Sequence, residues 1–216
     1  MEGKRRVGLI RVLTTTDVKL LNLHGELVMG YFPGLDVLSA CIPDQPEGVH
    51  DDKTERMAVP KVLALARKME ETGVEAVIVS CAGDPGVDLA AAALKIPVVG
   101  AGRAVAAVAR ALDLPVGVLG LTPLAPDPVA KILGDLVIAN LVPHGVRSTL
   151  DLMTPHGKES VLASGKKLKE MGARAILLAC TGMSTIGAAG FLTGELRIPV
   201  IDPVRSEAAV AWTLLG

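Results

Sequence analysis

Two of the three cysteines, Cys81 and Cys180, lie in segments of similar sequence and have the chemistry of acid/base groups. Each follows a short apolar run typical of a buried strand, and each has a glycine two residues later. A free thiol has a pKa of about 8.5, which a helix N-terminus lowers toward neutrality. A thiolate on one face of a carbon acid and a thiol on the other invert a stereocentre by removing one proton and returning another. The pair therefore predicts a racemase-type isomerase acting on a small molecule; the alternative is two small residues filling tight strand–helix corners.

The residues that follow each cysteine are suited to binding an anionic intermediate. The backbone N–H groups of Ala82, Gly83, Thr181 and Gly182 are candidate donors to the oxygen of an enolate formed between the two proton transfers. A glycine at each site also permits close approach of a ligand to the backbone.

The similarity between the two halves extends well beyond the cysteines. Residues 73–83 align without a gap with residues 172–182, an offset of 99 residues that also aligns the preceding helices. Two further pairs of matching segments occur in the same order: 7–10 with 116–119, and 96–99 with 198–201. The chain therefore reads as two copies of one unit with four strands and their helices.

The alternation of short β-branched runs with longer helical patterns predicts an α/β fold. Expected strands cover 7–13, 36–42, 76–80, 97–100, 116–121, 136–141, 175–179 and 199–201. Expected helices cover 17–28, 53–71, 85–94, 103–112, 128–133, 156–171, 186–196 and 206–214. Strands that are apolar on both faces belong to parallel sheets covered by helices. We predict two similar lobes (1–102 with 205–216, and 103–204), each a four-stranded mainly parallel sheet, related by a pseudo-two-fold with the site between them.

Three polar residues at strand ends are further candidates for contact with substrate, because ligands bind at the carboxyl ends of parallel strands. Asp84 precedes Pro85 and resembles a helix N-cap, with substrate contact as the alternative. Thr122 ends the strand equivalent to the first one and has either a ligand-binding or a structural role. Arg11 ends the first strand, where it is either a bidentate partner for a substrate carboxylate or a solvated arginine.

The two cysteine segments resemble the motifs of a known superfamily. Residues 80–86 (Ser-Cys-Ala-Gly-Asp-Pro-Gly) and 179–183 (Ala-Cys-Thr-Gly-Met) are similar to the cysteine motifs of the aspartate/glutamate/hydantoin racemases, and closest to the hydantoin racemase branch. Glutamate racemases tend to carry other residues where Ala82 and Gly182 stand here. The resemblance covers nearly the whole chain. It implies a two-lobed α/β racemase that needs neither pyridoxal phosphate nor metal, acts on a 5-substituted hydantoin and forms homo-oligomers.

One segment departs from the hydantoin racemase pattern. Those enzymes often carry Asn-Pro-Asn after the first strand, whereas this chain has Arg-Val-Leu-Thr-Thr-Thr-Asp at 11–17. An arginine there favours an acidic substrate over a neutral ring. Racemisation of aspartate or glutamate, a maleate isomerase-like or decarboxylase-like reaction, and binding without catalysis therefore remain alternatives.

Composition excludes several other classes of protein. A net charge of −1 and only 2% aromatic residues give no reason to expect nucleic acid as a partner. No apolar run approaches the ~20 residues of a membrane span, and the cysteines form no disulfide framework, so we expect a cytoplasmic protein. The histidines (24, 50, 144 and 156) are too scattered for a zinc site and are expected to be surface or local structural residues.

Overall fold

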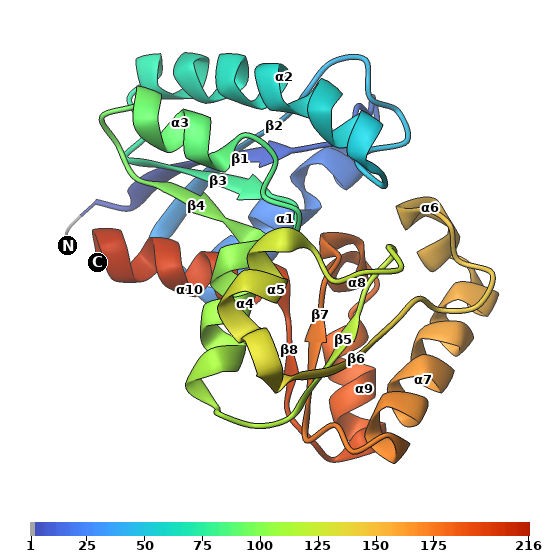
Figure 1. The fold of residues 1–216 in the computed structure, drawn as a ribbon. Helices are drawn as coiled ribbons and strands as arrows, with labels where there is room; N and C mark the ends of the chain where they lie inside the picture. Colours follow the sequence, from blue (N-terminus) through green and yellow to red (C-terminus); the bar gives the residue numbers. More distant parts are fainter. Residues whose placement is uncertain (1–2) are drawn as a thin grey trace. The chain divides into compact units, whose positions relative to one another are not determined.

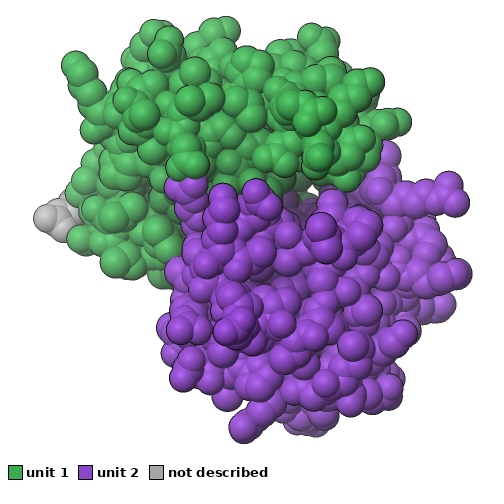
Figure 2. All heavy atoms as spheres, in the orientation of Figure 1, with its two compact units in different colours: residues 1–101, 204–216 green, residues 102–203 purple. Residues whose placement is uncertain are grey.

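The chain folds into two compact units, described here from a computed structural model that covers residues 3–216. The first unit contains the residues up to Ala101 and returns at Val204–Gly216, and the second contains Gly102–Pro203 (Figure 2). The first two residues of the predicted first lobe lie outside the described part of the chain. The chain therefore enters and leaves the second unit once each.

The first unit is a four-stranded parallel sheet with helices on both faces (Figure 1). Its elements are β1 (Arg5–Arg11), α1 (Val18–Tyr31), β2 (Leu35–Cys41), α2 (Asp52–Glu71), β3 (Ala76–Ser80), α3 (Val87–Ala93), β4 (Val98–Gly100) and α10 (Pro203–Leu215). The strand order is β2-β1-β3-β4, and every pairing is parallel. Asp17 caps α1 by accepting hydrogen bonds from the N–H groups of Lys19 and Leu20, which confirms the predicted helix start.

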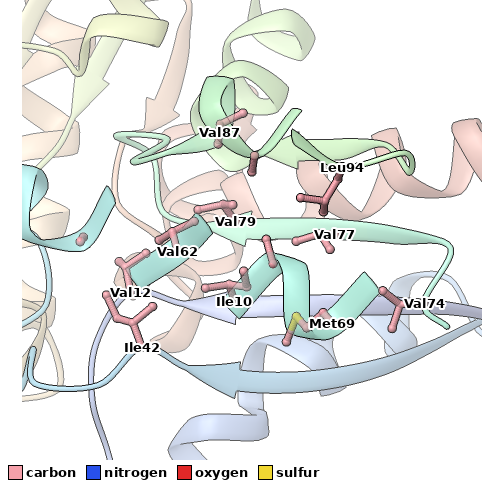
Figure 3. Packing of buried hydrophobic residues seen from close by; sticks show 13 residues of the cluster. Ile10, Val12, Ile42, Val62, Met69, Val74, Val77, Val79, Val87 and Leu94 are labelled. Carbon is pink, nitrogen blue, oxygen red and sulfur yellow. The ribbon is translucent and has the colours of Figure 1, made fainter. Parts of the chain in front are cut away.

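Successive residues of β3 face opposite sides of this sheet. Val77 and Val79 belong to the buried apolar cluster that α2 and α3 close, together with Ile10 and Val62 (Figure 3). The opposite face is covered by α1 and α10, whose side chains reach Ser80. The alternation follows from the two-residue period of a strand, and it means that neighbouring residues at the end of β3 have different surroundings.

The second unit repeats this architecture. Its elements are α4 (Ala101–Ala111), β5 (Val116–Leu119), α5 (Asp127–Leu133), a 3₁₀ turn η1 (Gly134–Leu136), β6 (Val137–Leu141), α6 (Thr149–Leu152), α7 (Pro155–Glu170), β7 (Ala175–Leu178), α8 (Thr181–Thr185), α9 (Ala188–Leu196) and β8 (Val200–Ile201). The strand order is β6-β5-β7-β8, again all parallel. One apolar cluster lies between the sheet and α7 with α9, and another lies between the sheet and α4 with α5.

The register of the central strands confirms the predicted duplication. Val7 pairs with Ala76 in the first unit, and their repeat equivalents Val116 and Ala175 pair in the second. The two sheets also share the same strand order. The prediction of an α/β chain with two similar four-stranded units is therefore confirmed, and both sheets are parallel throughout.

Two predicted helices differ from the structure near the cysteines. The helix expected at 85–94 begins only at Val87, and its N-cap is Gly86, which has a positive φ of 73°. The helix expected at 186–196 begins only at Ala188, as α9, and its N-cap Gly187 has a φ of 68°; the short helix α8 that precedes it was not predicted. In both places the chain uses left-handed backbone geometry, which glycine adopts readily.

Candidate active site

Cys81 follows β3 directly and is half-buried. Its N–H donates to the carbonyl of Val79 at 2.9 Å, and its own carbonyl accepts from the N–H of Asp84 at 3.0 Å. Two successive tight turns therefore set its position. The next helix, α3, starts at Val87, six residues beyond Cys81.

Asp84 is not the N-cap of the following helix, contrary to the prediction, because Gly86 takes that place and has no side-chain capping bond. Asp84 is buried and has a positive φ of 53°. Its carboxylate lies against Gly100 at the end of β4, where an added Cβ would come within 2.6 Å of Oδ1. The carboxylate is therefore held inside the unit, between the cysteine turn and the end of β4. Ala82 is buried in the same turn, and Gly83 is partly exposed.

Arg11 ends β1 and pairs in register with Ser80, one residue before Cys81. Its side chain is only 4% exposed, and Nη1 donates to the backbone carbonyl of Leu20 at 2.6 Å. A longer contact of 3.4 Å joins Nη1 to the carbonyl of Leu21. The guanidinium therefore lies against α1 and is not a solvated surface group.

Cys180 occupies the equivalent place in the second unit. It is half-buried and is the N-cap of α8, with its carbonyl accepting from the N–H of Met183 at 3.0 Å. Thr181 is partly exposed and Gly182 is buried in the first turn of α8. A Cβ on Gly182 would meet Thr149 Cγ2 at 2.9 Å, so glycine allows α6 to pack against α8.

Two other polar residues line the carboxyl edge of the second sheet. The Thr122 hydroxyl donates to the carbonyl of Leu124 at 2.7 Å, and its backbone carbonyl accepts from the Asn140 side chain at 2.9 Å. Ser184 on α8 donates to Asp202 Oδ1 at 2.9 Å, and both side chains are buried. Each unit thus brings one cysteine, a buried carboxylate and a polar strand-end residue to the carboxyl edge of its own sheet.

Sequence reasoning missed a buried polar set beside Cys81. His24 Nδ1 lies 2.9 Å from Ser80 Oγ, and Ser80 Oγ donates to Glu207 Oε1 at 2.7 Å. His24 belongs to α1 and Glu207 to α10, which are far apart in the sequence. His24 was predicted to be a surface or local structural residue; it is fully buried, so a surface position is wrong, and the prediction left out its serine and glutamate partners. No sequence pattern connects the three residues.

The part of the chain that the structure describes has no group of three or more His, Cys, Asp or Glu side chains arranged to hold a metal ion. None of its helices is long and apolar enough to cross a membrane.

Comparisons with known proteins identify the family. The sequence model of the family Asp/Glu/Hydantoin racemase matches residues 29–211. The chain is 31% identical over 183 residues to a hydantoin racemase of Rhizobium meliloti, covering 80% of this chain and 73% of that one. It is also 31% identical over 181 residues to a hydantoin racemase of Pseudomonas sp. (strain NS671), covering 79% and 70%. The structure matches allantoin racemase from Klebsiella pneumoniae with a TM-score of 0.82 and 26% identity, covering 98% of this chain and 87% of that one.

A parallel α/β repeat with a cysteine at each equivalent strand end, together with these matches, defines a racemase-type isomerase. The chain belongs to the Asp/Glu/hydantoin racemase family. The resemblance predicted from the two cysteine segments is therefore confirmed.

Proposed function

We propose that this racemase inverts the C5 stereocentre of 5-substituted hydantoins, with Cys81 and Cys180 as the two acid/base groups. The observation that carries the proposal is the equivalence of the two cysteines: each lies just beyond the third strand of its unit, at the same offset of 99 residues as the surrounding repeat. Two hydantoin racemases at 31% identity support the substrate class. The match to an allantoin racemase supports inclusion of allantoin, itself a hydantoin substituted at C5.

In the proposed reaction, one cysteine is a thiolate and the other a thiol. The thiolate removes the C5 proton, which the adjacent carbonyl acidifies, and the C5–H electron pair moves into an enolate. The thiol then gives its proton to the opposite face of C5. The substrate keeps its composition, and the two sulfurs exchange protonation states, ready for the opposite enantiomer. No redox step and no external reactant are needed.

The remaining candidate residues have supporting roles in this proposal. Backbone N–H groups at Ala82, Gly83, Thr181 and Gly182 stabilise the enolate oxygen, because preorganised donors act where charge develops. Asp84 and Thr122 shape the substrate pocket. Arg11 contributes its charge from the α1 side, and its bonds to α1 carbonyls favour a neutral ring over a carboxylate held directly by its guanidinium.

Solvent deuterium incorporation followed by NMR tests this proposal. D- and L-5-substituted hydantoins, allantoin, aspartate and glutamate would be incubated in D₂O with the wild type, Cys81→Ser and Cys180→Ser, alongside enzyme-free samples. The matched control is Cys41→Ser, which changes the third cysteine. We expect the wild type and the control to exchange and invert a hydantoin. Each of the other serine variants should lose about 10²–10⁴ in the rate of inversion.

The same panel separates the alternatives. Exchange of aspartate or glutamate without exchange of any hydantoin would indicate an amino-acid racemase. Arg11 would then be the candidate partner of the substrate carboxylate. Full activity of Cys81→Ser or Cys180→Ser would refute the two-thiol mechanism.

A further inference from the structure

Three buried polar side chains meet on the face of the first sheet that α1 and α10 cover. Ser80 Oγ lies between His24 Nδ1 at 2.9 Å and Glu207 Oε1 at 2.7 Å. Their exposed fractions are 1%, 0% and 0%. Burial of polar groups is costly unless they are hydrogen-bonded to one another. The serine is therefore held from both sides by residues of two different helices.

The number of protons on the serine hydroxyl determines which groups donate and which accept hydrogen bonds in this set. A serine hydroxyl can donate one hydrogen bond, and Ser80 donates it to Glu207 Oε1. The 2.9 Å contact with His24 must then be a bond that Nδ1–H donates and Ser80 Oγ accepts. Rotation of the Ser80 side chain would break both bonds at once.

Ser80 is also the middle residue of the turn that leads into Cys81. The bond from Cys81 N–H to the carbonyl of Val79 closes a three-residue turn centred on Ser80. The Cys81 side chain packs on the α2/α3 side of the sheet, with the cluster that contains Val79. Ser80 points to the opposite side. Its anchored side chain therefore acts on Cys81 through the backbone of the turn, and not by contact with the thiol.

The second unit has no counterpart of this anchor. The residue before Cys180 is Ala179, whose side chain belongs to an apolar cluster and whose N–H donates to the Leu119 carbonyl at 2.8 Å. Cys180 is held instead as the N-cap of α8. The two cysteines thus have equivalent positions but different means of support.

We propose that Ser80, fixed between His24 and Glu207, is a positioning residue for the Cys81 thiol and has no effect on Cys180. The inference rests on the proposed function for its catalytic meaning, because it names the group that positions one of the two acid/base thiols. His24 and Glu207 act through Ser80.

Site-resolved alkylation tests the proposal without a substrate. The full-length protein would be treated with iodoacetamide, and the modification rates of Cys81 and Cys180 would be measured by peptide mass spectrometry. In Ser80→Ala we expect the ratio of the two rates to change at least about threefold, because the alkylation rate of a thiol depends on its exposure and on its thiolate fraction, and both change when the thiol moves. Ser80→Thr keeps the hydroxyl and should return the ratio to within about twofold of wild type.

The matched control is Ser184→Ala, which removes the other buried serine–carboxylate bond, in the second unit. It should leave the alkylation rate of Cys81 unchanged. With a racemised hydantoin, Ser80→Ala should lower kcat about tenfold or more while KM stays within about twofold, because only the acid/base group moves.

Two results would overturn the proposal. One is an unchanged ratio in a folded Ser80→Ala variant, and the other is an equal change at both cysteines. If that variant does not fold, Glu207→Gln is the deciding variant, since it weakens the bond to Ser80 but keeps an acceptor oxygen. An unchanged ratio of the two alkylation rates in Glu207→Gln would then refute the positioning role of Ser80. Failure of the proposed function gives a different result: full activity of Cys81→Ser would refute the two-thiol mechanism, whereas the alkylation ratio of Ser80→Ala is measured without substrate and does not depend on that outcome.

Discussion

Replacement of Gly83 by alanine separates a role in substrate approach from a role in folding. An added Cβ at Gly83 would lie 3.9 Å from Cys81 Sγ and 4.0 Å from Pro85 Cδ, both ordinary van der Waals contacts. Gly83 is not among the glycines with positive φ, so alanine fits its backbone. Alanine allows the unfolded chain fewer conformations than glycine does. The substitution should therefore raise the free energy of unfolding by about 0.4–1 kcal/mol.

Activity should move in the opposite direction. Proton transfer to the sulfur needs the reacting atoms within about 3–3.5 Å. In the proposed two-thiol mechanism the substrate approaches Cys81, and an added methyl group 3.9 Å from Sγ would occupy part of the space for that approach. We expect kcat/KM for the racemised hydantoin to fall at least tenfold, which is about 1.4 kcal/mol of lost transition-state stabilisation. Thermal unfolding and initial-rate polarimetry on the same preparation measure the two effects.

Two other glycines are matched controls for this experiment. A Cβ at Gly190 on α9 meets no atom within 4 Å, so Gly190→Ala should raise stability and leave activity unchanged. A Cβ at Gly182 would be 2.9 Å from Thr149 Cγ2, so Gly182→Ala should lower stability and activity together. If Gly83→Ala retains kcat/KM within twofold of wild type, the substrate does not approach Cys81 from the side of this turn.

Two predictions concern stability in the first unit. The carboxylate of Asp51 accepts from the N–H of Thr54 at 2.7 Å, and its pKa is lowered chiefly by the Thr54 side-chain hydrogen bond. This stabilisation is present above about pH 4 and is lost as the pH falls through the lowered folded pKa. In urea unfolding from pH 5 to 2, the free energy of unfolding of Asp51→Asn should therefore fall less steeply than that of the wild type. An equally steep fall would contradict this prediction. A Cβ on Gly34 would lie 2.5 Å from Trp212 Cζ3, so Gly34→Ala should cost about 1–3 kcal/mol. Because the clash is with the ring, Trp212→Leu in the same chain should recover part of that loss.

The repeated unit could be predicted from sequence because its signals are local. The match of residues 73–83 to residues 172–182 contains a strand, the preceding turn and a cysteine in one uninterrupted segment. Apolar runs of this length favour strands buried on both faces. The offset differs between the first strand (109 residues) and the third strand (99 residues), yet the registers are equivalent, because Val7 pairs with Ala76 and Val116 with Ala175.

The turn after Cys81 was predicted less well, because two local signals conflict there. Asp84 followed by Pro85 is typical of a helix start. Asp84 instead adopts a positive φ of 53°, and the helix begins only at Val87, with Gly86 as its N-cap. The carboxylate packs on Gly100, a partner from another strand that no local pattern identifies.

The set of Ser80, His24 and Glu207 shows the same limit more strongly. The histidine and the glutamate each lie in a helix, where a charged or polar residue is ordinarily solvated. Only the packing of α1 and α10 on the same face of the sheet makes them partners of one serine. Prediction of such a set requires the tertiary arrangement, because the three residues are distant in the sequence and meet only in the folded structure.

Each unit buries a carboxylate at the carboxyl edge of its sheet, but the two copies supply it from different positions in the sequence. At the repeat offset of 102 residues that relates 96–99 to 198–201, Gly100 corresponds to Asp202. In the first unit the carboxylate comes from the cysteine turn, as Asp84, and a side chain at position 100 would collide with it. In the second unit the strand end supplies the carboxylate, as Asp202, and α8 supplies a hydroxyl from Ser184. Each unit therefore has one buried acid at the carboxyl edge of its sheet, supplied by the cysteine turn in the first unit and by the end of the fourth strand in the second.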